Sequence, residues 1–336
     1  MVHHILGYQH ARILGDFRHF AHVVEFAGPL GVKIFFVISG FVICRLLIVE
    51  EERTGTVSLR GFYLRRVFRI LPAFYVYLCV ISVLLTLNLI DASAGAILMS
   101  GLFVHDFRLG FQDSWFVGHT WSLAVEEQFY LLFPAFWVLT PKVLRFRFFL
   151  ALTGLIAAWN TAAAWGGWNG VMYPSARAGF VCISAGILLA ICEARARRAV
   201  RRLPAILPAA AAVLLVWHPV GAHGVLSTLY EVLAVPPAIV LLLTFSLERG
   251  PALRAFLVSK PVQAVGLSSY GIYLWQQLFT APLQTFASGG RLISMLLPAL
   301  FVVVPASYFL IEKPAIRLGR MLSSPPADGP PVAELA

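Results

Sequence analysis

The sequence predicts an all-α fold, a polytopic transmembrane helical bundle with about nine full spans and a remnant or missing first span. Hydrophobic residues make up 59% of the 336 residues, charged residues only 12%, and the mean hydropathy is +0.81. A soluble domain carries about a quarter charged residues, so this chain could not cover its own surface in water. Apolar windows of about 20 residues, enough to cross a bilayer core of roughly 30 Å, recur along its length.

The candidate spans alternate with short basic connections. The spans occupy residues 31–49, 70–90, 121–140, 147–165, 174–193, 204–218, 224–246, 262–287 and 291–311, and the basic connections are 50–69, 142–147, 194–202, 249–260 and 313–320. All five connections can lie in the cytoplasm, as the positive-inside rule expects, provided that the apolar stretch 94–104 does not cross. That stretch is too short for a span and suits an interfacial or re-entrant segment.

The two ends of the chain carry separate expectations. The same count places residues 9–30 outside the cytoplasm, and residues 1–8 are too short to have crossed the bilayer. Either the N-terminus starts outside or the first span lies upstream of Met1, and we favour the second. Residues 323–336 are rich in proline and alanine without periodicity, which predicts a disordered C-terminal tail after a single membrane domain at 1–322.

The formal net charge of +10 does not indicate a nucleic-acid-binding protein. The arginines gather in short runs between apolar segments, as in Glu193-Ala-Arg-Ala-Arg-Arg-Ala-Val-Arg-Arg, and membrane topology explains such runs. The four cysteines lie in or beside apolar segments without CxxC spacing, so they predict small buried side chains rather than a disulfide or metal site.

The pair Glu126 and Glu127 is the first candidate site, because ionisable groups at membrane depth are costly and mark function by default. On a helix, Ser122, Glu126 and Tyr130 follow i, i+4 spacing and share a face, which His119 joins if the helix includes it, whereas Glu127 points about 100° away. A carboxylate with a hydroxyl and an imidazole on one inward face could act as a general base or bind a sugar hydroxyl. The equally open alternative is a structural pair of carboxylates neutralised by arginines or hydrogen bonds.

Arg66 and Arg69 form the second candidate site. They lie one helical turn apart just before an apolar span, so both guanidinium groups can face one site, and arginine pairs bind phosphate bidentately. A phosphate-bearing acyl donor would suit them, although topology alone explains basic residues at this place.

Other ionisable residues are weaker candidates. Five histidines are crowded into residues 1–22, but their spacing matches no zinc-ligand pattern, and no metal is expected. A histidine at the outer end of a span could still act as a base toward a hydroxyl. Arg177 and Glu231 lie within predicted spans, where an internal ion pair or snorkelling is the alternative to function.

Five segments resemble, in order, the blocks of the acyltransferase family 3 membrane proteins, which include O-acetyltransferases of exopolysaccharides and lipopolysaccharide. The segments are Gly31-Val-Lys-Ile-Phe-Phe-Val-Ile-Ser-Gly-Phe-Val-Ile, Leu64-Arg-Arg-Val-Phe-Arg-Ile-Leu-Pro, Thr120-Trp-Ser-Leu-Ala-Val-Glu-Glu-Gln-Phe-Tyr, Ser269-Tyr-Gly-Ile-Tyr-Leu-Trp-Gln-Gln and Tyr308-Phe-Leu-Ile-Glu-Lys-Pro. The third block is specific, and together the five cover nearly the whole chain.

The resemblance implies transfer of an acyl group, usually acetyl, from acyl-CoA at the cytoplasmic side to a hydroxyl of a glycan or lipid-linked saccharide. It implies a bacterial inner-membrane enzyme with acyl-CoA as co-substrate, no bound cofactor and membrane lipid around it. A histidine acting at the hydroxyl would correspond to His4, or to His3 if the register differs by one. The family's paired arginines match Arg66 and Arg69, and its acidic positions match Glu126 and Glu312. The oligomeric state is not readable.

The sequence departs from the family pattern at two places that concern the site. An Arg-Gly pair usual about ten residues before the histidine lies outside this chain, and the later block reads Trp275-Gln276 where the family often has Trp-His. No role that needs a titratable group can be assigned to Gln276. The competing hypotheses are a transporter or flippase of a lipid-linked glycan or small acid, whose path the same charges would line, and an inactive truncated family member.

Overall fold

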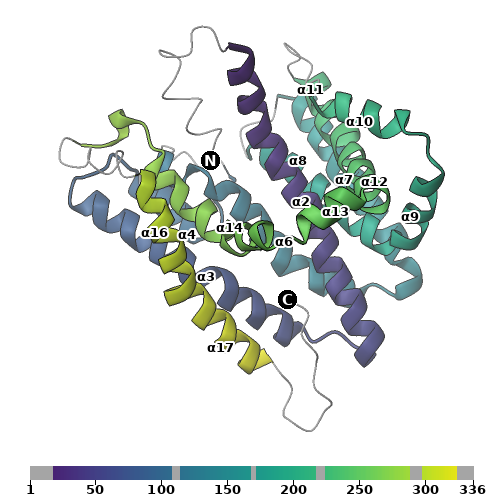
Figure 1. Cartoon of the computed structure of the whole chain (residues 1–336), viewed down its shortest axis with the longest axis horizontal. Coiled ribbons are helices and arrows are strands. Elements are labelled where there is room, and N and C mark those ends of the chain that lie inside the picture. Colours follow the sequence, from purple (N-terminus) through teal and green to yellow (C-terminus); the bar gives the residue numbers. More distant parts are fainter. Residues whose placement is uncertain (1–17, 108–113, 168–171, 217–223, 288–296, 324–336) are drawn as a thin grey trace.

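The computed structural model describes residues 18–107, 114–167, 172–216, 224–287 and 297–323. The candidate histidines His3 and His4 and nearly all of the predicted tail lie outside the described residues. Throughout the described part the chain is helical, with two isolated β-bridges and no strand (Figure 1). The predicted all-α class is therefore confirmed for this part of the chain.

The α-helices follow one another with short connections. They are α2 (Arg18–Thr54), α3 (Leu59–Thr86), α4 (Ala94–Gly101), α5 (Trp115–Gly118), α6 (Thr120–Leu139), α7 (Arg145–Trp165), α8 (Pro174–Ile191), α9 (Glu193–Arg202), α10 (Ile206–Val216), α11 (Val225–Leu229), α12 (Val235–Arg249), α13 (Pro251–Leu257), α14 (Lys260–Phe279), α16 (Leu300–Ser307) and α17 (Lys313–Ser323). Two π-helical turns, η2 (Tyr230–Ala234) and η6 (Tyr308–Glu312), interrupt longer helices.

The described residues contain six helical segments long and apolar enough to cross a membrane, or seven if the bent pair α9–α10 counts as one span. The predicted count of nine spans is therefore not established. The number and apolar character of these helices still make this a multi-pass membrane protein. Of the predicted spans, 121–140 and 262–287 fall short because α6 and α14 carry many polar residues. Eight-residue α4 is about 12 Å long, too short to cross.

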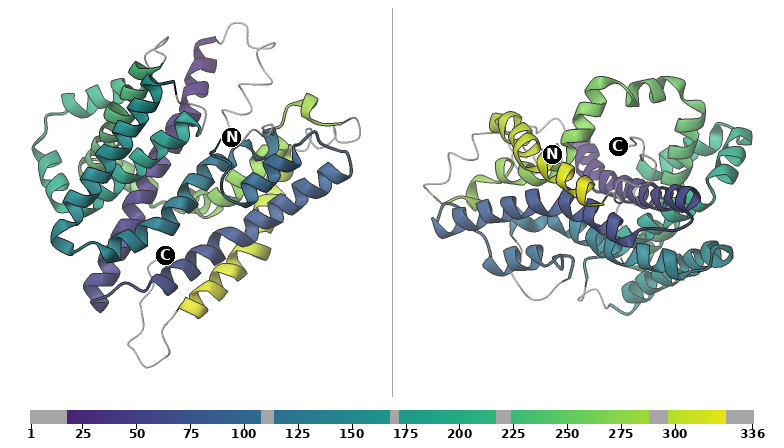
Figure 2. Two further views of the ribbon diagram at one scale, coloured as in Figure 1. Left: turned by 180° about the vertical axis from the view of Figure 1, so that it is seen from behind. Right: turned by 90° about the horizontal axis from the view of Figure 1, so that it is seen from below.

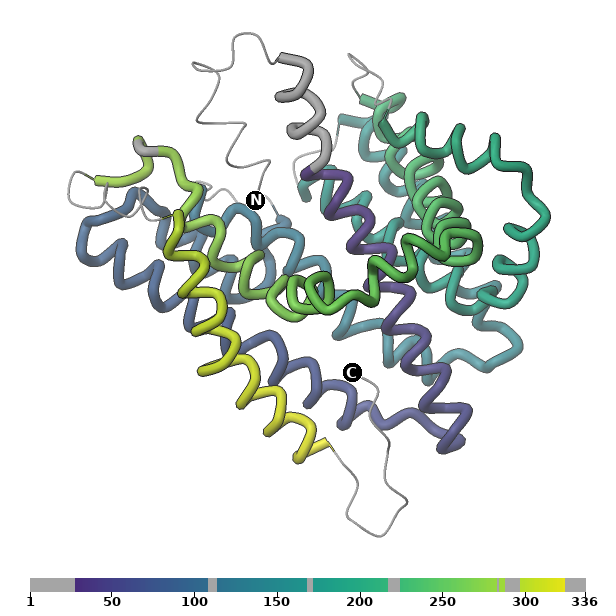
Figure 3. The backbone as a smooth tube through the Cα atoms, in the orientation of Figure 1, coloured from purple at the N-terminus to yellow at the C-terminus, as the bar shows by residue number. Residues whose placement is uncertain are grey.

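Two predicted spans contain a break next to a proline. The described part of the span predicted at 204–218 is α10, which bends away from α9 by 108° and counts as a span only together with it (Figure 3). Leu203 is extended because the proline that follows it disfavours helical geometry there. The span predicted at 262–287 ends as helix at Phe279, and Pro282 follows in a non-helical segment.

Helix α2 runs between two groups of helices (Figure 2). On one side α2 packs along α8, and α7, α10 and α12 belong to the same group. On the other side α2 contacts α6, and beyond α6 lie α3, α14, α16 and α17. The contact of α2 with α8 is a close backbone approach, since a Cβ on Gly40 would overlap the Ile183 carbonyl and one on Gly186 would overlap the Val37 carbonyl. Small residues at such crossings let membrane helices pack closely.

The five basic connections meet at one end of the bundle, the arginine-rich end. Arg145 of α7 pairs with Glu51 of α2 at 2.5 and 3.0 Å, and Arg197 of α9 pairs with Glu248 of α12 at 2.7 Å. Arg45 pairs with Glu193 and thereby joins α2 to α9. This shared end is what the prediction of a common cytoplasmic side requires.

We expect Gly40→Ala to destabilise the protein by about 1–3 kcal/mol, because the new methyl group must push the two helix backbones apart. Gly31→Ala on the same helix is the matched control, since its Cβ meets nothing within 4 Å. Thermal unfolding of both variants in one detergent measures the difference. Equal unfolding temperatures for the two variants would contradict the close packing of α2 on α8.

Candidate active site

The centre of the site is the Glu126 carboxylate, which is 7% exposed and lies on α6 in the interior of the bundle. Ser39 of α2 donates a hydrogen bond to Glu126 Oε1 at 2.8 Å, and the Tyr130 hydroxyl donates to the same oxygen. The Ser39 and Tyr130 hydroxyl oxygens are 2.9 Å apart. Hydrogen bonds from two hydroxyl groups on two helices therefore fix the direction in which this carboxylate points.

Arg66 of α3 brings a positive charge to this carboxylate. Its guanidinium carbon lies 4.9 Å from the centre of the Tyr130 ring and 5.8 Å from that of Phe62, in cation–π contact with both. The charge of Arg66 interacts with those of Glu126 and Glu127. A half-buried arginine stacked on aromatic rings is held in place while its N–H groups stay available for an anionic ligand.

Glu127 follows Glu126 on α6, so its side chain leaves the helix about 100° around from it. Its Oε1 is buried and has no hydrogen-bond partner among the described residues. The charge of Glu127 interacts with Arg66 and with Tyr270 of α14, whose hydroxyl donates to the Ile70 carbonyl at 2.8 Å. Glu127 therefore belongs to the same polar region as Glu126 and lies on the side of that region that faces α14.

Arg69 and Glu312 complete this region. The π-turn η6 carries Glu312, which is 4% exposed, and Ser307 donates to its Oε1 at 3.2 Å. A Cβ on Gly271 would lie only 3.2 Å from Glu312 Oε1, so glycine lets α14 approach this carboxylate closely. The charge of Arg69 interacts with both Glu312 and Glu126.

His119 and Ser122 lie farther along, at the end of α6 opposite the arginine-rich end. His119 is the N-cap residue of α6, so it precedes the helix, and its ring lies 4.9 Å from the Tyr273 ring. Ser122 shares a hydrogen bond of 3.0 Å with the Tyr273 hydroxyl rather than contacting Glu126. We call these residues the far end of the site.

The structure thus brings most of the predicted site residues together. Glu126 and Tyr130 are in direct contact, Arg66 contacts Tyr130, and the charges of the other members interact across α3, α6 and η6. The members of this central region are Arg66, Arg69, Glu126, Glu127, Tyr130 and Glu312. His119 and Ser122 are adjacent to it, and His3 and His4 lie outside the described residues.

The sequence did not single out three residues that hold this region together. Ser39 lies 87 positions from Glu126, and Tyr270 and Tyr273 lie on a later helix, so no local spacing connects them to the carboxylate. Two features of the sequence could have pointed to them. One is the single serine in the otherwise apolar block that begins at Gly31, and the other is a pair of tyrosines one helical turn apart.

The chemistry available is therefore that of arginines, carboxylates and hydroxyls. Among the described residues no group of three or more His, Cys, Asp or Glu side chains could hold a metal ion. Arg66 and Arg69 offer an anion site near the arginine-rich end, about 10 Å along α3 from its start, and Glu126 lies deeper. The arginine pair and the Glu126 carboxylate therefore follow one another along the bundle axis.

Two other ionisable residues from the sequence analysis lie away from this region. Glu231, in the π-turn η2, pairs with Lys33 of α2 inside the bundle, which matches the structural alternative rather than a site. Arg177 is 4% exposed in the first turn of α8.

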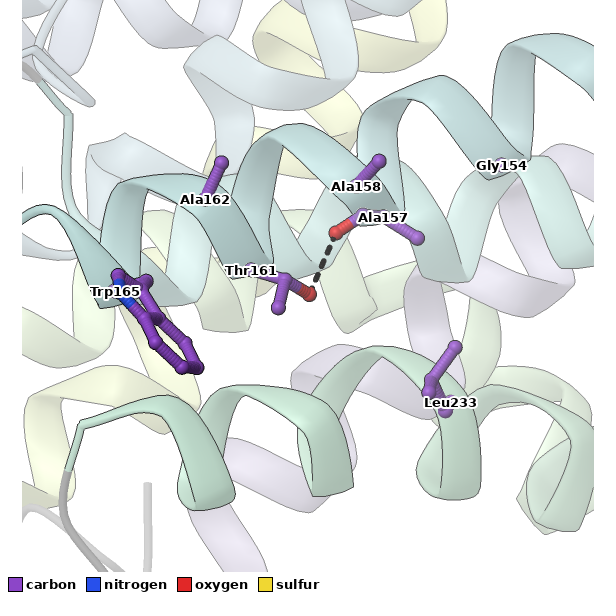
Figure 4. A pocket seen from close by; sticks show the side chains of 7 residues that line it. All are labelled: Gly154, Ala157, Ala158, Thr161, Ala162, Trp165 and Leu233. Carbon is purple, nitrogen blue, oxygen red and sulfur yellow. Dashed lines mark hydrogen bonds between the residues drawn. The ribbon is translucent and has the colours of Figure 1, made fainter.

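An apolar pocket of about 520 Å³ lies between α7 and η2 (Figure 4). It is lined by Gly154, Ala157, Ala158, Thr161, Ala162, Trp165 and Leu233. The Thr161 hydroxyl donates to the Ala157 carbonyl at 3.0 Å and so offers no free donor to the pocket. None of the predicted site residues contributes to it, so this pocket is separate from the candidate site.

A polar cluster around Asp106, between α4 and α5, was not expected from the sequence. Asp106 is fully buried, and Gln128 donates to its Oδ1 at 2.9 Å. Burial raises the pKa of Asp106 to about 6, while the bond from Gln128 lowers it by a smaller amount. Ser100, His105 and Thr120 are hydrogen-bonded beside it.

The comparisons with known proteins agree on one family. The family described as an acyltransferase domain matches residues 1–312. A peptidoglycan O-acetyltransferase OatA of Listeria monocytogenes is 28% identical over 323 residues, which cover 87% of this chain and 52% of that protein. An O-acetyltransferase OatA of Staphylococcus aureus is 39% identical over 134 residues, which cover 36% of this chain and 21% of that protein.

The match to the Listeria protein is partial in length. The chain spans about half the length of that relative. No solved structure matches the chain.

The raised pKa of the buried Asp106 predicts how the stability of the protein depends on pH. The raised pKa means that the folded protein binds this proton more tightly than the unfolded chain does, so the stabilisation is present at low pH and is lost as pH rises through about 6. We expect Asp106→Asn to flatten the pH dependence of the unfolding temperature between about pH 4 and 6.5, the range between the unfolded and folded pKa values. Asp91→Asn, at an exposed carboxylate, is the control. A wild-type pH profile retained in Asp106→Asn would contradict this assignment.

Proposed function

The chain belongs to the acyltransferase domain family, and from this premise we propose that it is a membrane-bound O-acetyltransferase of a bacterial inner membrane. It moves an acetyl group from acetyl-CoA to a hydroxyl of a glycan or glycoconjugate. The observation that carries the proposal is the buried Glu126 carboxylate, fixed by Ser39 and Tyr130 beside the stacked Arg66 guanidinium. Residues 1–322 form the acyltransferase domain in this proposal.

The arginine pair supplies the donor site. The phosphates of acetyl-CoA bind Arg66 and Arg69 near the arginine-rich end, which is the cytoplasmic end in this proposal. The thioester arm then extends inward toward Glu126, so the nucleotide itself need not cross the membrane. The planar guanidinium of Arg66 suits phosphate because it offers paired N–H groups in a fixed plane.

The reaction joins the acceptor hydroxyl to the acetyl carbonyl. The hydroxyl oxygen attacks the thioester carbon, a C–O bond forms, the C–S bond breaks, and the hydroxyl proton passes by way of a base to the departing CoA thiolate. We assign the base to His4, or to His3 in the alternative register, with Glu126 orienting the reacting groups. In the alternative route the histidine first takes the acetyl group and then passes it to the hydroxyl, with the same net result.

The acceptor is proposed by class. The Listeria relative is named as a peptidoglycan O-acetyltransferase, which supports a glycan hydroxyl as the acceptor here. A lipid-linked saccharide is the form in which such a glycan lies at the membrane surface. Acetyl-CoA serves as co-substrate, and no bound cofactor is needed for this transfer.

The donor site predicts a selective effect of Arg66→Lys. Lysine keeps the charge but loses the paired N–H groups and the stacking on Tyr130, so we expect the KM for acetyl-CoA to rise at least about tenfold while kcat changes by less than about threefold. Arg65→Lys is the matched control, because Arg65 on the same helix is exposed and pairs with Glu50. An unchanged KM in Arg66→Lys, or an equal rise in Arg65→Lys, would contradict the donor site.

The proposed activity is tested by proton NMR of O-acetyl groups on the surface glycan. We expect deletion of the gene to remove these signals, the wild-type gene to restore them, and Glu126→Gln to restore at most about 1%. Glu193→Gln, which alters a carboxylate at the arginine-rich end, is the control that should restore them fully. Signals that persist after deletion would contradict a glycan O-acetyltransferase, and full restoration by Glu126→Gln at normal expression would remove the carboxylate from the mechanism.

A further inference from the structure

Three buried polar atoms in the last turns of α14 have no hydrogen-bond partner among the described residues. One is Gln277 Oε1, whose side chain is already held by its Nε2, which donates to the Trp115 carbonyl at 2.7 Å. The other two are the indole Nε1 of Trp275 and the side-chain oxygen Oε1 of Gln276, and both residues are 7% exposed. Buried polar groups are almost always paired, and an unpaired one is costly. A donor and an acceptor left open on consecutive residues therefore indicate a ligand that offers both functions.

The two tyrosine hydroxyl groups nearby already have hydrogen-bond partners. The Tyr77 hydroxyl donates to the Phe116 carbonyl at 2.5 Å, and the Tyr273 hydroxyl donates to the His119 carbonyl at 2.7 Å. The Trp275 ring stands edge-on to Tyr77 with centroids 5.4 Å apart, and Tyr77 stands edge-on to His119 at 5.8 Å. The result is a rigid aromatic wall from α3, α14 and the start of α6, whose hydroxyl groups are in use while Trp275 and Gln276 remain open.

This wall differs in charge from the central region. The charges of the central region reach α14 at Tyr270, Gly271 and Tyr273, and no described contact brings one of these charges to Trp275 or Gln276. Trp275, Gln276, Tyr77 and Tyr273 are uncharged. Such a wall suits a neutral ligand with an apolar face and several hydroxyl groups, and a sugar ring has both.

We infer that Trp275 and Gln276 form the subsite that binds the acceptor sugar, an inference that rests on the proposed function. Trp275 Nε1 donates to one sugar hydroxyl and Gln276 Oε1 accepts from another, since neighbouring helix positions point about 100° apart. An amide does not titrate near neutral pH, so Gln276 binds and orients the acceptor and does not take its proton. Donor and acceptor therefore enter the site from opposite ends of α3 and α14.

The test uses two variants that remove one hydrogen-bonding group each, Trp275→Phe and Gln276→Leu. Each is expressed in the gene-deletion strain, and the O-acetyl content of the surface glycan is measured by NMR. The Kd for acetyl-CoA and the unfolding temperature are measured on the purified full chain. We expect O-acetylation to fall at least about tenfold while the Kd for acetyl-CoA stays within about twofold.

Two controls separate this effect from general damage. In Trp137→Phe the lost Nε1 is also buried without a partner among the described residues, but it lies by Arg145 at the arginine-rich end. Gln263→Leu changes an exposed glutamine of α14. Both should keep wild-type O-acetylation. Wild-type O-acetylation in Trp275→Phe and Gln276→Leu, or an equal weakening of acetyl-CoA binding, would overturn the subsite. A wild-type gene that restores no O-acetyl groups would instead overturn the proposed function and the subsite with it.

Discussion

The arrangement of the bundle depends on one constraint, which is to hold the Glu126 carboxylate away from lipid. An ionisable side chain in the membrane interior is expensive unless other groups compensate for the lost water. Ser39 and Tyr130 bind its Oε1, and the Arg66 charge lies behind the Tyr130 ring. Because these partners come from α2, α3 and α6, the three helices must meet at this point.

The same constraint explains which helices face lipid. Helices α6 and α14 carry the polar residues of the site and fall short of the other spans in apolar character, whereas α2, α3, α7 and α12 present apolar side chains outward. The close contact of Gly40 with α8 and the close approach of α14 to Glu312 at Gly271 bring the backbones near enough to enclose the polar groups. A Cβ at Gly40 would overlap the α8 backbone, whereas one at Gly271 would press on the Glu312 carboxylate.

Sequence patterns predicted the parts of the site that local geometry controls. The i, i+4 spacing placed Tyr130 beside Glu126, and the one-turn spacing placed Arg66 and Arg69 where both charges reach Glu126. Spacing misplaced Ser122, which shares the face of Glu126 but bonds to Tyr273, because a helix face is wider than one contact. Ser39, Tyr270, Trp275 and the cluster around Asp106 could not be foreseen, since their partners come from distant segments.

A structure with bound donor tests directly whether the donor reaches the transfer site from the arginine-rich end. The measurement is a cryo-electron microscopy structure of the full chain in lipid nanodiscs with acetonyl-CoA, a non-reactive analogue of acetyl-CoA. We expect phosphate density against Arg66 and Arg69 and the acetonyl group beside Glu126. Analogue bound elsewhere on the protein, with the Arg66 and Glu126 contacts unchanged from those described, would contradict it.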